Sequence, residues 1–246
     1  MYTSNHSDKC VYNKFDHKRK GVIICLYVDD MLIFGTDEDQ VNKTKKFLSS
    51  KLLMKDMGVT DVILGIRIKR DSKCITITQS HYIEKILKKF NCENCSSVST
   101  PIDPNLKLLP NSSKAVKQHE YSQAIGYLIY TITSTRSDIA YAVGKLSRFT
   151  SNPGTHHWYA INRVFKYLKL TMDYGITYSG FPPIIEGYLD ASGITNVEDH
   201  SFTRSWIFLL GGGVISWALK KQTCITTLTM ESEFVALLAA SIKPNG

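Results

Sequence analysis

Two short apolar segments on either side of an aspartate pair most constrain how this chain can fold. Segment 21–28 is apolar and β-prone, Asp29 and Asp30 interrupt the pattern, and 31–34 is apolar again. Because β-prone runs separated by a polar break form hairpins, we predict a hairpin with both carboxylates at its tip. Adjacent carboxylates repel each other unless a cation or proton intervenes, and Mg²⁺ is the usual hard cation for such oxygen ligands. An aspartate pair is also a good turn sequence that needs no metal.

Helical and strand patterns alternate through the rest of the N-terminal half. Acidic residues at 37–39, followed by apolar residues at helical spacing, predict an amphipathic helix over 37–54. Segments 62–69 and 74–78 have the composition of two strands joined by a polar turn. Ser80 can cap a further helix, whose apolar side chains recur at helical spacing: Ile83, Ile86, Leu87 and Phe90.

The C-terminal half changes from helices to strands. Segment 96–120 is rich in Ser, Pro, Asn and Lys, which predicts a linker. Helices are expected at 121–133, 137–150 and 155–170. After Pro182-Pro183 the pattern predicts strands at 184–189, 205–210, 214–217 and 224–227, then a helix from about Met230. We therefore expect an α/β (α+β) chain of two units joined by a helical connection.

Length, composition and charge exclude several protein classes. With 246 residues and 43% hydrophobic residues, the chain is neither disordered nor fibrous. Its apolar runs are too short for a membrane span, and the first 16 residues lack the apolar core of a signal peptide, so an intracellular location is expected. Residues 41–180 carry twenty-one Lys and Arg against nine Asp and Glu, which suggests an anionic polymer as partner. Lysines that merely solvate helix faces are the alternative.

Three other motifs are expected to be structural. Six scattered cysteines do not form a disulfide scaffold, and Cys92-x-x-Cys95 lacks the second pair that a zinc finger needs. His156 and His157 are adjacent, so they do not converge on one ion from a helix. The glycines at 211–213 have no Gly-Lys-Ser/Thr after them, which favours a turn over a phosphate-binding loop.

Several motifs, in order, resemble a known family. The sequence LYVDDML at 26–32 resembles the YxDD catalytic hairpin of reverse transcriptases, in the form used by copia-type retrotransposons. Segment 62–68 is similar to the family's next hairpin, which grips the primer end. The remaining matches are to the opening of the thumb, to the segment after it and to the connection: 78–83, 98–101, 134–140, 157–158 and 163–168.

The last third resembles the family's ribonuclease H domain. Segment 186–191 is similar to the first strand, which carries the metal-binding aspartate, here Asp190, and 211–217 to the hairpin between the next two strands. Segment 230–237 resembles the helix with the catalytic glutamate. In that helix a small residue follows the glutamate three positions later, so Glu233, which precedes Ala236, is preferred over Glu231.

The resemblance implies a domain order and a chemistry. Partial palm and thumb would occupy 1–95, a linker 96–120, a helical connection 121–180 and a truncated ribonuclease H-like mixed sheet 181–246. Asp29 and Asp30 would bind Mg²⁺ for adding deoxynucleotides to a template–primer. Asp190 and Glu233 would bind Mg²⁺ for cleaving the RNA of an RNA–DNA hybrid.

Both resembling sites are incomplete in this sequence. The family's polymerase site has a further aspartate before the YxDD hairpin, and its ribonuclease H site has one after the glutamate helix; this sequence contains neither. We therefore expect a Pol fragment that is inactive alone. A non-catalytic nucleic-acid-binding remnant is one alternative. A fragment that does not fold stably, because its sheet lacks strands and exposes unpaired edges, is another.

Overall fold

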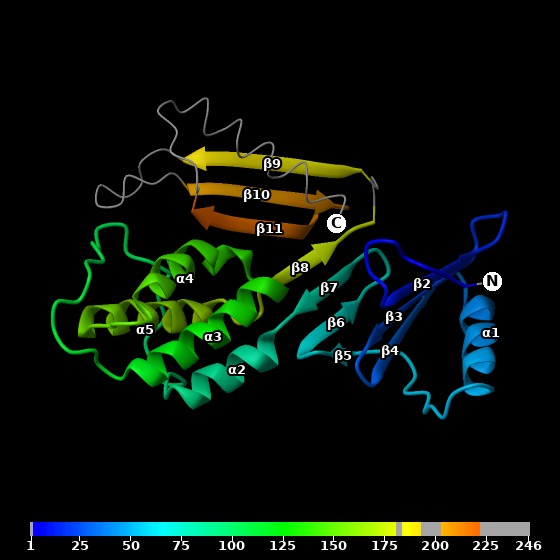
Figure 1. The fold of residues 1–246 in the computed structure, drawn as a ribbon, viewed down its shortest axis with the longest axis horizontal. Coiled ribbons are helices and arrows are strands. Elements are labelled where there is room, and N and C mark those ends of the chain that lie inside the picture. The colour runs from blue at the N-terminus through cyan, green and yellow to red at the C-terminus, as the bar shows by residue number, and fades with distance from the viewer. Residues whose placement is uncertain (1, 181–183, 193–202, 222–246) are drawn as a thin grey trace. The chain divides into compact units, whose positions relative to one another are not determined.

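The computed structural model describes residues 2–180, 184–192 and 203–221 (Figure 1). The described residues divide into two compact units, 2–59 and the described residues from 60 to 221. The boundary between the units falls inside the segment 1–95 that the resemblance assigns to palm and thumb together.

The first unit is an antiparallel sheet with one helix on it. Its strands lie in the order β1 (Thr3–Ser4), β2 (Val11–Phe15), β3 (Gly21–Tyr27) and β4 (Asp30–Gly35). Helix α1 (Glu38–Ser49) begins where the Asp37 carboxylate accepts a hydrogen bond from the Gln40 N–H at 2.9 Å. The helix packs against β3 and β4, on the sheet face where Val22 and Ile24 are buried.

Two features of this unit differ from the sequence prediction. The helix ends at Ser49 rather than at residue 54, and Leu52 and Leu53 are exposed. A helix is stabilised mainly by burying its apolar face, and no apolar surface covers these two leucines, so nothing stabilises a further helical turn. Strands β1 and β2 were not predicted; β2 has the sequence VYNKF, which lacks the alternation of polar and apolar residues that marks a strand.

The second unit contains a sheet that joins distant parts of the chain. Its order is β5 (Val62–Ile63), β6 (Ile66–Arg70), β7 (Ile75–Thr78) and β8 (Gly175–Tyr178), all antiparallel. The prediction of one strand over 62–69 was wrong, because a two-residue turn at Leu64-Gly65 divides it into two. The pairing of β7 with β8 joins segments about 100 residues apart, as Thr76 opposite Thr177 illustrates.

The helices of the second unit surround its main core. They are α2 (Ser80–Lys89), α3 (Gln118–Ser134), α4 (Ala140–Leu146) between short 3₁₀ turns at Ser137–Ile139 and Ser147–Phe149, and α5 (Thr155–Leu170). These bounds confirm the predicted helices. The core contains the apolar faces of all four helices, including Ile83, Leu128, Leu146 and Phe165. No helix in the described part of the chain is long and apolar enough to cross a membrane.

Segment 96–117 contains no helix or strand, although the structure describes all of it. It is nevertheless anchored to the start of α5. The Val116 N–H donates to the Pro153 carbonyl at 2.8 Å, and the Trp158 indole N–H donates to the Val116 carbonyl at 3.0 Å. The segment is therefore held against the helical core rather than free of it.

A third sheet is formed by β9 (Ile185–Ser192), β10 (Thr203–Leu210) and β11 (Gly213–Lys221), in the order β11-β10-β9. These strands confirm three of the predicted strands; those at 224–227 and the helix from Met230 lie outside the described residues. All pairs in the described part of this sheet are antiparallel, so the parallel pair of a mixed sheet is not among them. Overall, the described residues form an α+β structure with three antiparallel sheets and five α-helices.

Candidate functional site

Asp29 and Asp30 lie at the tip of the β3–β4 hairpin, as predicted. Tyr27 pairs directly with Asp30, so Val28 and Asp29 form a two-residue turn. Both carboxylates are exposed to solvent. The hairpin thus presents two adjacent acids to solvent instead of burying either.

The backbone at this tip is strained. Val28 has a φ of 51°, in the left-handed region that a β-branched residue rarely adopts, and its side chain is 89% exposed. A strained residue of this kind costs on the order of 1–3 kcal/mol, and such residues cluster at functional sites. No packing of the Val28 side chain offsets that cost.

Replacing Val28 with glycine is therefore expected to stabilise the first unit, because glycine adopts positive φ without a steric penalty. After the added freedom of glycine in the unfolded chain is subtracted, we expect a gain of about 0.5–1 kcal/mol in the free energy of unfolding, measured by urea titration. Val59→Gly is the matched control, since Val59 is also exposed but lacks positive φ. It should be neutral or destabilising, and equal gains in both variants would contradict strain at Val28.

Asp30 shares one sheet face with apolar side chains that α1 does not cover. Residues directly opposite each other in an antiparallel pair lie on the same face of the sheet. Asp30 is opposite Tyr27, and Phe34 is opposite Ile23. Tyr27 and Ile23 are an even number of residues apart on β3, so both pairs lie on one face. Tyr27, Ile23 and Phe34 are exposed, whereas Val22 and Ile24 on the α1 face are buried. The acids therefore border an uncovered apolar surface.

The donor chemistry of this tip fits Mg²⁺. Two carboxylates supply the hard oxygen ligands that Mg²⁺ prefers, and Mg²⁺ is commonly held by one or two carboxylates together with substrate phosphates. Within the described residues no group of three or more His, Cys, Asp or Glu side chains comes together at a point. The tip therefore provides part of a ligand set.

The predicted ribonuclease H residues are only partly described. Asp190 lies on β9, opposite Ser205 of β10, and is exposed. Glu233 and the alternative Glu231 lie outside the described residues.

A second hairpin, β5–β6, carries another unusual turn. Leu64 and Gly65 have φ of 51° and 71°, the backbone of a type I′ turn, which normally has Asn or Gly at the first position. The Leu64 side chain is 41% exposed. Basic side chains follow on β6 and in the next turn: Arg67, Lys69, Arg70 and Lys73. An apolar tip beside basic residues suits contact with a nucleic-acid strand.

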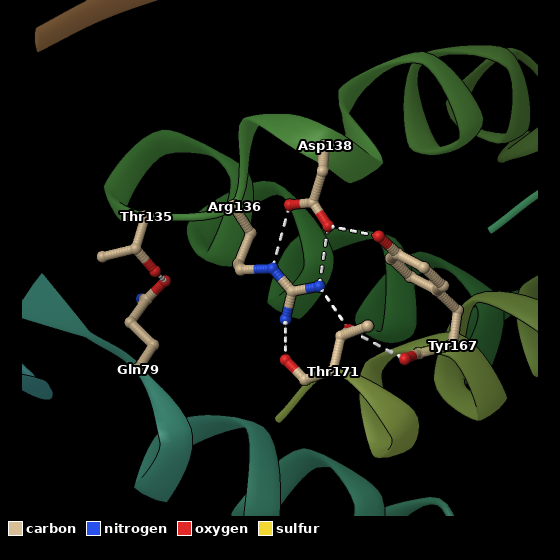
Figure 2. A network of polar contacts seen from close by, with 6 residues as sticks. All are labelled: Gln79, Thr135, Arg136, Asp138, Tyr167 and Thr171. Carbon is tan, nitrogen blue, oxygen red and sulfur yellow. Dashed lines mark hydrogen bonds and ion pairs between the residues drawn. The ribbon is translucent and has the colours of Figure 1, made fainter. Parts of the chain in front are cut away.

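A buried ion pair in the helical layer is the feature that the sequence reasoning missed. Arg136 is 1% exposed and donates two hydrogen bonds to Asp138, at 2.9 and 2.7 Å (Figure 2). Its guanidinium also donates to the carbonyl and the hydroxyl of Thr171, at 3.0 and 2.6 Å. The Tyr167 hydroxyl donates to Asp138 at 2.9 Å. The network thus ties the turn after α3 to the end of α5.

The charge state of this network follows from its geometry. Burial raises the pKa of Asp138, but the hydrogen bonds and charge of Arg136 and the Tyr167 hydroxyl outweigh burial and lower that pKa overall. Asp138 is thus an anion paired with a cation. The only sequence signal was Arg136 two residues before Asp138, within a motif that the family resemblance had already marked.

The remaining candidates contact the protein itself, but the prediction that His156 and His157 do not converge was wrong: Nε2 of each ring lies 3.0 Å from the Leu109 carbonyl oxygen. His157 is buried, accepts a hydrogen bond from the Gly154 N–H at its Nδ1 and donates from Nε2 to the Leu109 carbonyl, at 2.8 and 3.0 Å. Cys92 lies in the core and, like the other described cysteines, is not in a disulfide. Gly211 and Gly212, with φ of 57° and 76°, form the turn between β10 and β11.

Comparison with known proteins identifies the family. The family described as "Reverse transcriptase (RNA-dependent DNA polymerase)" matches residues 1–104. The chain is 30% identical over 219 residues to the putative transposon Ty5-1 protein of Saccharomyces cerevisiae, which covers 87% of this chain and 71% of that protein. It is 38% identical over 244 residues to the retrovirus-related Pol polyprotein from transposon TNT 1-94 of Nicotiana tabacum. The chain belongs to the reverse transcriptase region of copia-type retrotransposon Pol polyproteins.

The match to the Pol polyproteins is partial. The alignment with the tobacco protein covers 96% of this chain but 18% of that protein. The chain is also 34% identical over 215 residues to the Pol polyprotein from transposon RE1 of Arabidopsis thaliana, covering 87% of this chain and 15% of that protein. No solved structure matches the chain. Proteins of the reverse transcriptase family act on a nucleic-acid template–primer and typically use Mg²⁺.

Proposed function

We propose that Asp29 and Asp30 hold Mg²⁺ for nucleotide addition when this chain is part of an intact Pol polyprotein. The observation that carries the proposal is the strained, solvent-exposed turn that presents both carboxylates beside an uncovered sheet face. Asp29 and Asp30 would hold the ion there, and it would supply Lewis acidity to the primer 3′-hydroxyl that attacks the α-phosphorus and to the pyrophosphate that leaves. The role of the two aspartates is to hold the ion, and the role of the hairpin is to place both acids at one edge.

A further ligand would come from a strand outside this sequence. Strand β4 begins at Asp30 and, among the described residues, pairs only with β3. Its other edge is therefore unpaired by any described strand. An additional strand on this edge would bring its own side chains next to Asp30. The chain alone is accordingly expected to bind nucleic acid without extending a primer.

We also propose that the C-terminal sheet belongs to a ribonuclease H-like domain. In that domain Asp190 and Glu233 would hold Mg²⁺ for cleavage of the RNA strand of an RNA–DNA hybrid. Support comes from the order of β9, β10 and β11 and from the position of Asp190 on β9. From the family resemblance we likewise propose palm and thumb at 1–95, a linker at 96–120 and the helical connection at 121–180. A non-catalytic nucleic-acid-binding remnant is the second candidate, favoured by the incomplete ligand set at Asp29 and Asp30.

All of these proposals require the chain to bind nucleic acid, and template–primer binding measured across a salt series tests this requirement. For roughly four phosphate contacts, affinity should fall about 100-fold between 50 and 200 mM salt. Replacing Lys69 and Lys73, both exposed near the β6–β7 turn, with glutamine should reduce the log–log slope by about one for each lysine that contacts phosphate. Lys9→Gln with Lys18→Gln, outside the basic segment 41–180, is the control and should leave the slope unchanged.

The metal proposal needs its own readout on the same chain. Mg²⁺ should tighten binding of a template–primer with deoxynucleotide, and Asp30→Asn should remove that effect. Asp39→Asn makes the same charge change at an exposed site of the first unit and should retain it. A Mg²⁺ effect that persists in Asp30→Asn would refute the assignment. Primer extension or hybrid cleavage by the chain alone would show that its ligand sets are complete.

A further inference from the structure

The tip of the β5–β6 hairpin is held from outside by a tyrosine of α3. The Tyr130 hydroxyl donates a 2.5 Å hydrogen bond to the carbonyl of Leu64, the first residue of the turn. The two residues are 66 positions apart in the sequence. This bond therefore connects the helical layer directly to the turn.

Tyr82 of α2 supports the same contact. Its ring lies 4.9 Å from that of Tyr130, centroid to centroid, in an edge-on arrangement. The nearest neighbour of a Cβ added at Gly65 would be the Tyr82 ring, at 4.0 Å. Tyr82 and Tyr130 thus bracket the turn, one through its ring beside Gly65 and the other through its hydroxyl on Leu64.

The turn has a reason to need such support. Leu64 is in the left-handed backbone region at a φ of 51°, and its side chain is half-exposed, so neither backbone preference nor burial stabilises the turn. Strands β5 and β6 share two residue pairs, and one further backbone hydrogen bond joins the arms, from the Ile68 N–H to the Asp61 carbonyl at 2.8 Å. A hairpin this short is marginal by itself, and an external hydrogen bond to its turn carbonyl restricts where its tip can lie.

We propose that Tyr130 is a positioning residue that holds the β5–β6 tip in place against the primer strand. The inference rests on the proposed template–primer binding, and it takes the β5–β6 tip, which lies on the same sheet as Lys69, to be part of that contact. It adds that a residue of α3 decides where that contact is made.

The matched control is on the same helix. Tyr127 lies one turn before Tyr130 and also contacts the Tyr82 ring, but its hydroxyl accepts a hydrogen bond from Lys89 at 2.8 Å rather than reaching the hairpin. Tyr130→Phe and Tyr127→Phe each remove one hydroxyl and keep the ring. A difference between them therefore reports the bond to Leu64.

Two measurements on the full chain test the proposal. Amide hydrogen exchange at Gly65 and Ile66 should become about two- to tenfold faster in Tyr130→Phe, the range expected for one lost hydrogen bond, while core amides of α3 are unchanged. A photoreactive base at the primer 3′ end should crosslink to the hairpin peptide in the unchanged chain, and less in Tyr130→Phe at equal template–primer occupancy. Tyr127→Phe should match the unchanged chain in both.

The outcomes separate the two proposals. No template–primer binding by the unchanged chain would overturn the proposed function and this inference with it. Binding with the same exchange and crosslinking in Tyr130→Phe as in the unchanged chain would overturn this inference alone. So would equal effects in the two variants, or accelerated exchange throughout α3, because either result would mark a general packing role.

Discussion

Replacing Arg136 with methionine is expected to lower the free energy of unfolding of the second unit by about 3–5 kcal/mol, the range for breaking a buried ion pair by removing one partner. The substitution keeps most of the side-chain volume but leaves Asp138 without its cation and Thr171 without two hydrogen bonds. Equilibrium denaturation followed by circular dichroism measures the loss.

Two further variants distinguish an unpaired charge from general damage. Arg70→Met removes an exposed arginine whose closest carboxylate, Asp61, is 3.9 Å away, and should cost no more than about 1 kcal/mol. Combining Arg136→Met with Asp138→Leu removes both charges and should recover part of the lost stability. A double variant that is less stable than Arg136→Met would argue against the stranded carboxylate as the cause.

Acid is expected to destabilise the second unit through His157. Burial, and then the nearby His156, lower the pKa of His157 from 6.5 to about 4, so the folded protein keeps this ring neutral. The unfolded chain binds a proton more readily between these values. Stability from this group is therefore complete above about pH 6.5 and is lost as the pH falls toward 4, by up to roughly 3 kcal/mol. Urea unfolding measured across this range tests the expectation.

His157→Gln should flatten that pH dependence, since the titrating group is gone, whatever the substitution does to stability at neutral pH. His119→Gln, at an exposed position of α3, should keep the full dependence. The loss of stability in acid has a structural reason. Protonating His157 Nδ1 would remove the acceptor for the Gly154 N–H and break the hydrogen bond at the start of α5. Parallel curves for the unchanged chain and His157→Gln would contradict the assignment.

Local patterns predicted much of the secondary structure. Helices α2, α3 and α5 and the β3–β4 hairpin lie where apolar spacing placed them. Each depends on a periodicity that is visible within about twenty residues. The Asp29–Asp30 tip was predictable for the same reason. Two apolar runs form the paired strands of a hairpin, so the acid pair between them falls in the turn.

The errors have equally physical causes. The composition of 62–69 did not mark Leu64 as a turn residue, since leucine is rare at positive φ, although the family resemblance had assigned a hairpin to 62–68. The contact from Tyr130, 66 residues later, is not visible in the local sequence. The 37–54 prediction failed at its end because helical spacing continued where no surface was available to bury Leu52 and Leu53.

The sequence by itself determined the family, the positions of most helices and the pair of carboxylates at the first hairpin, because these depend on short motifs and local periodicity. Only the tertiary structure decided that β8 completes the sheet of β7, that Arg136 is buried against Asp138 and Thr171, and that Tyr130 holds the second turn. These contacts join segments that are distant in sequence or place a charge where only packing removes water. Neither a long-range contact nor the burial of a charge can be predicted from the local pattern of polar and apolar residues.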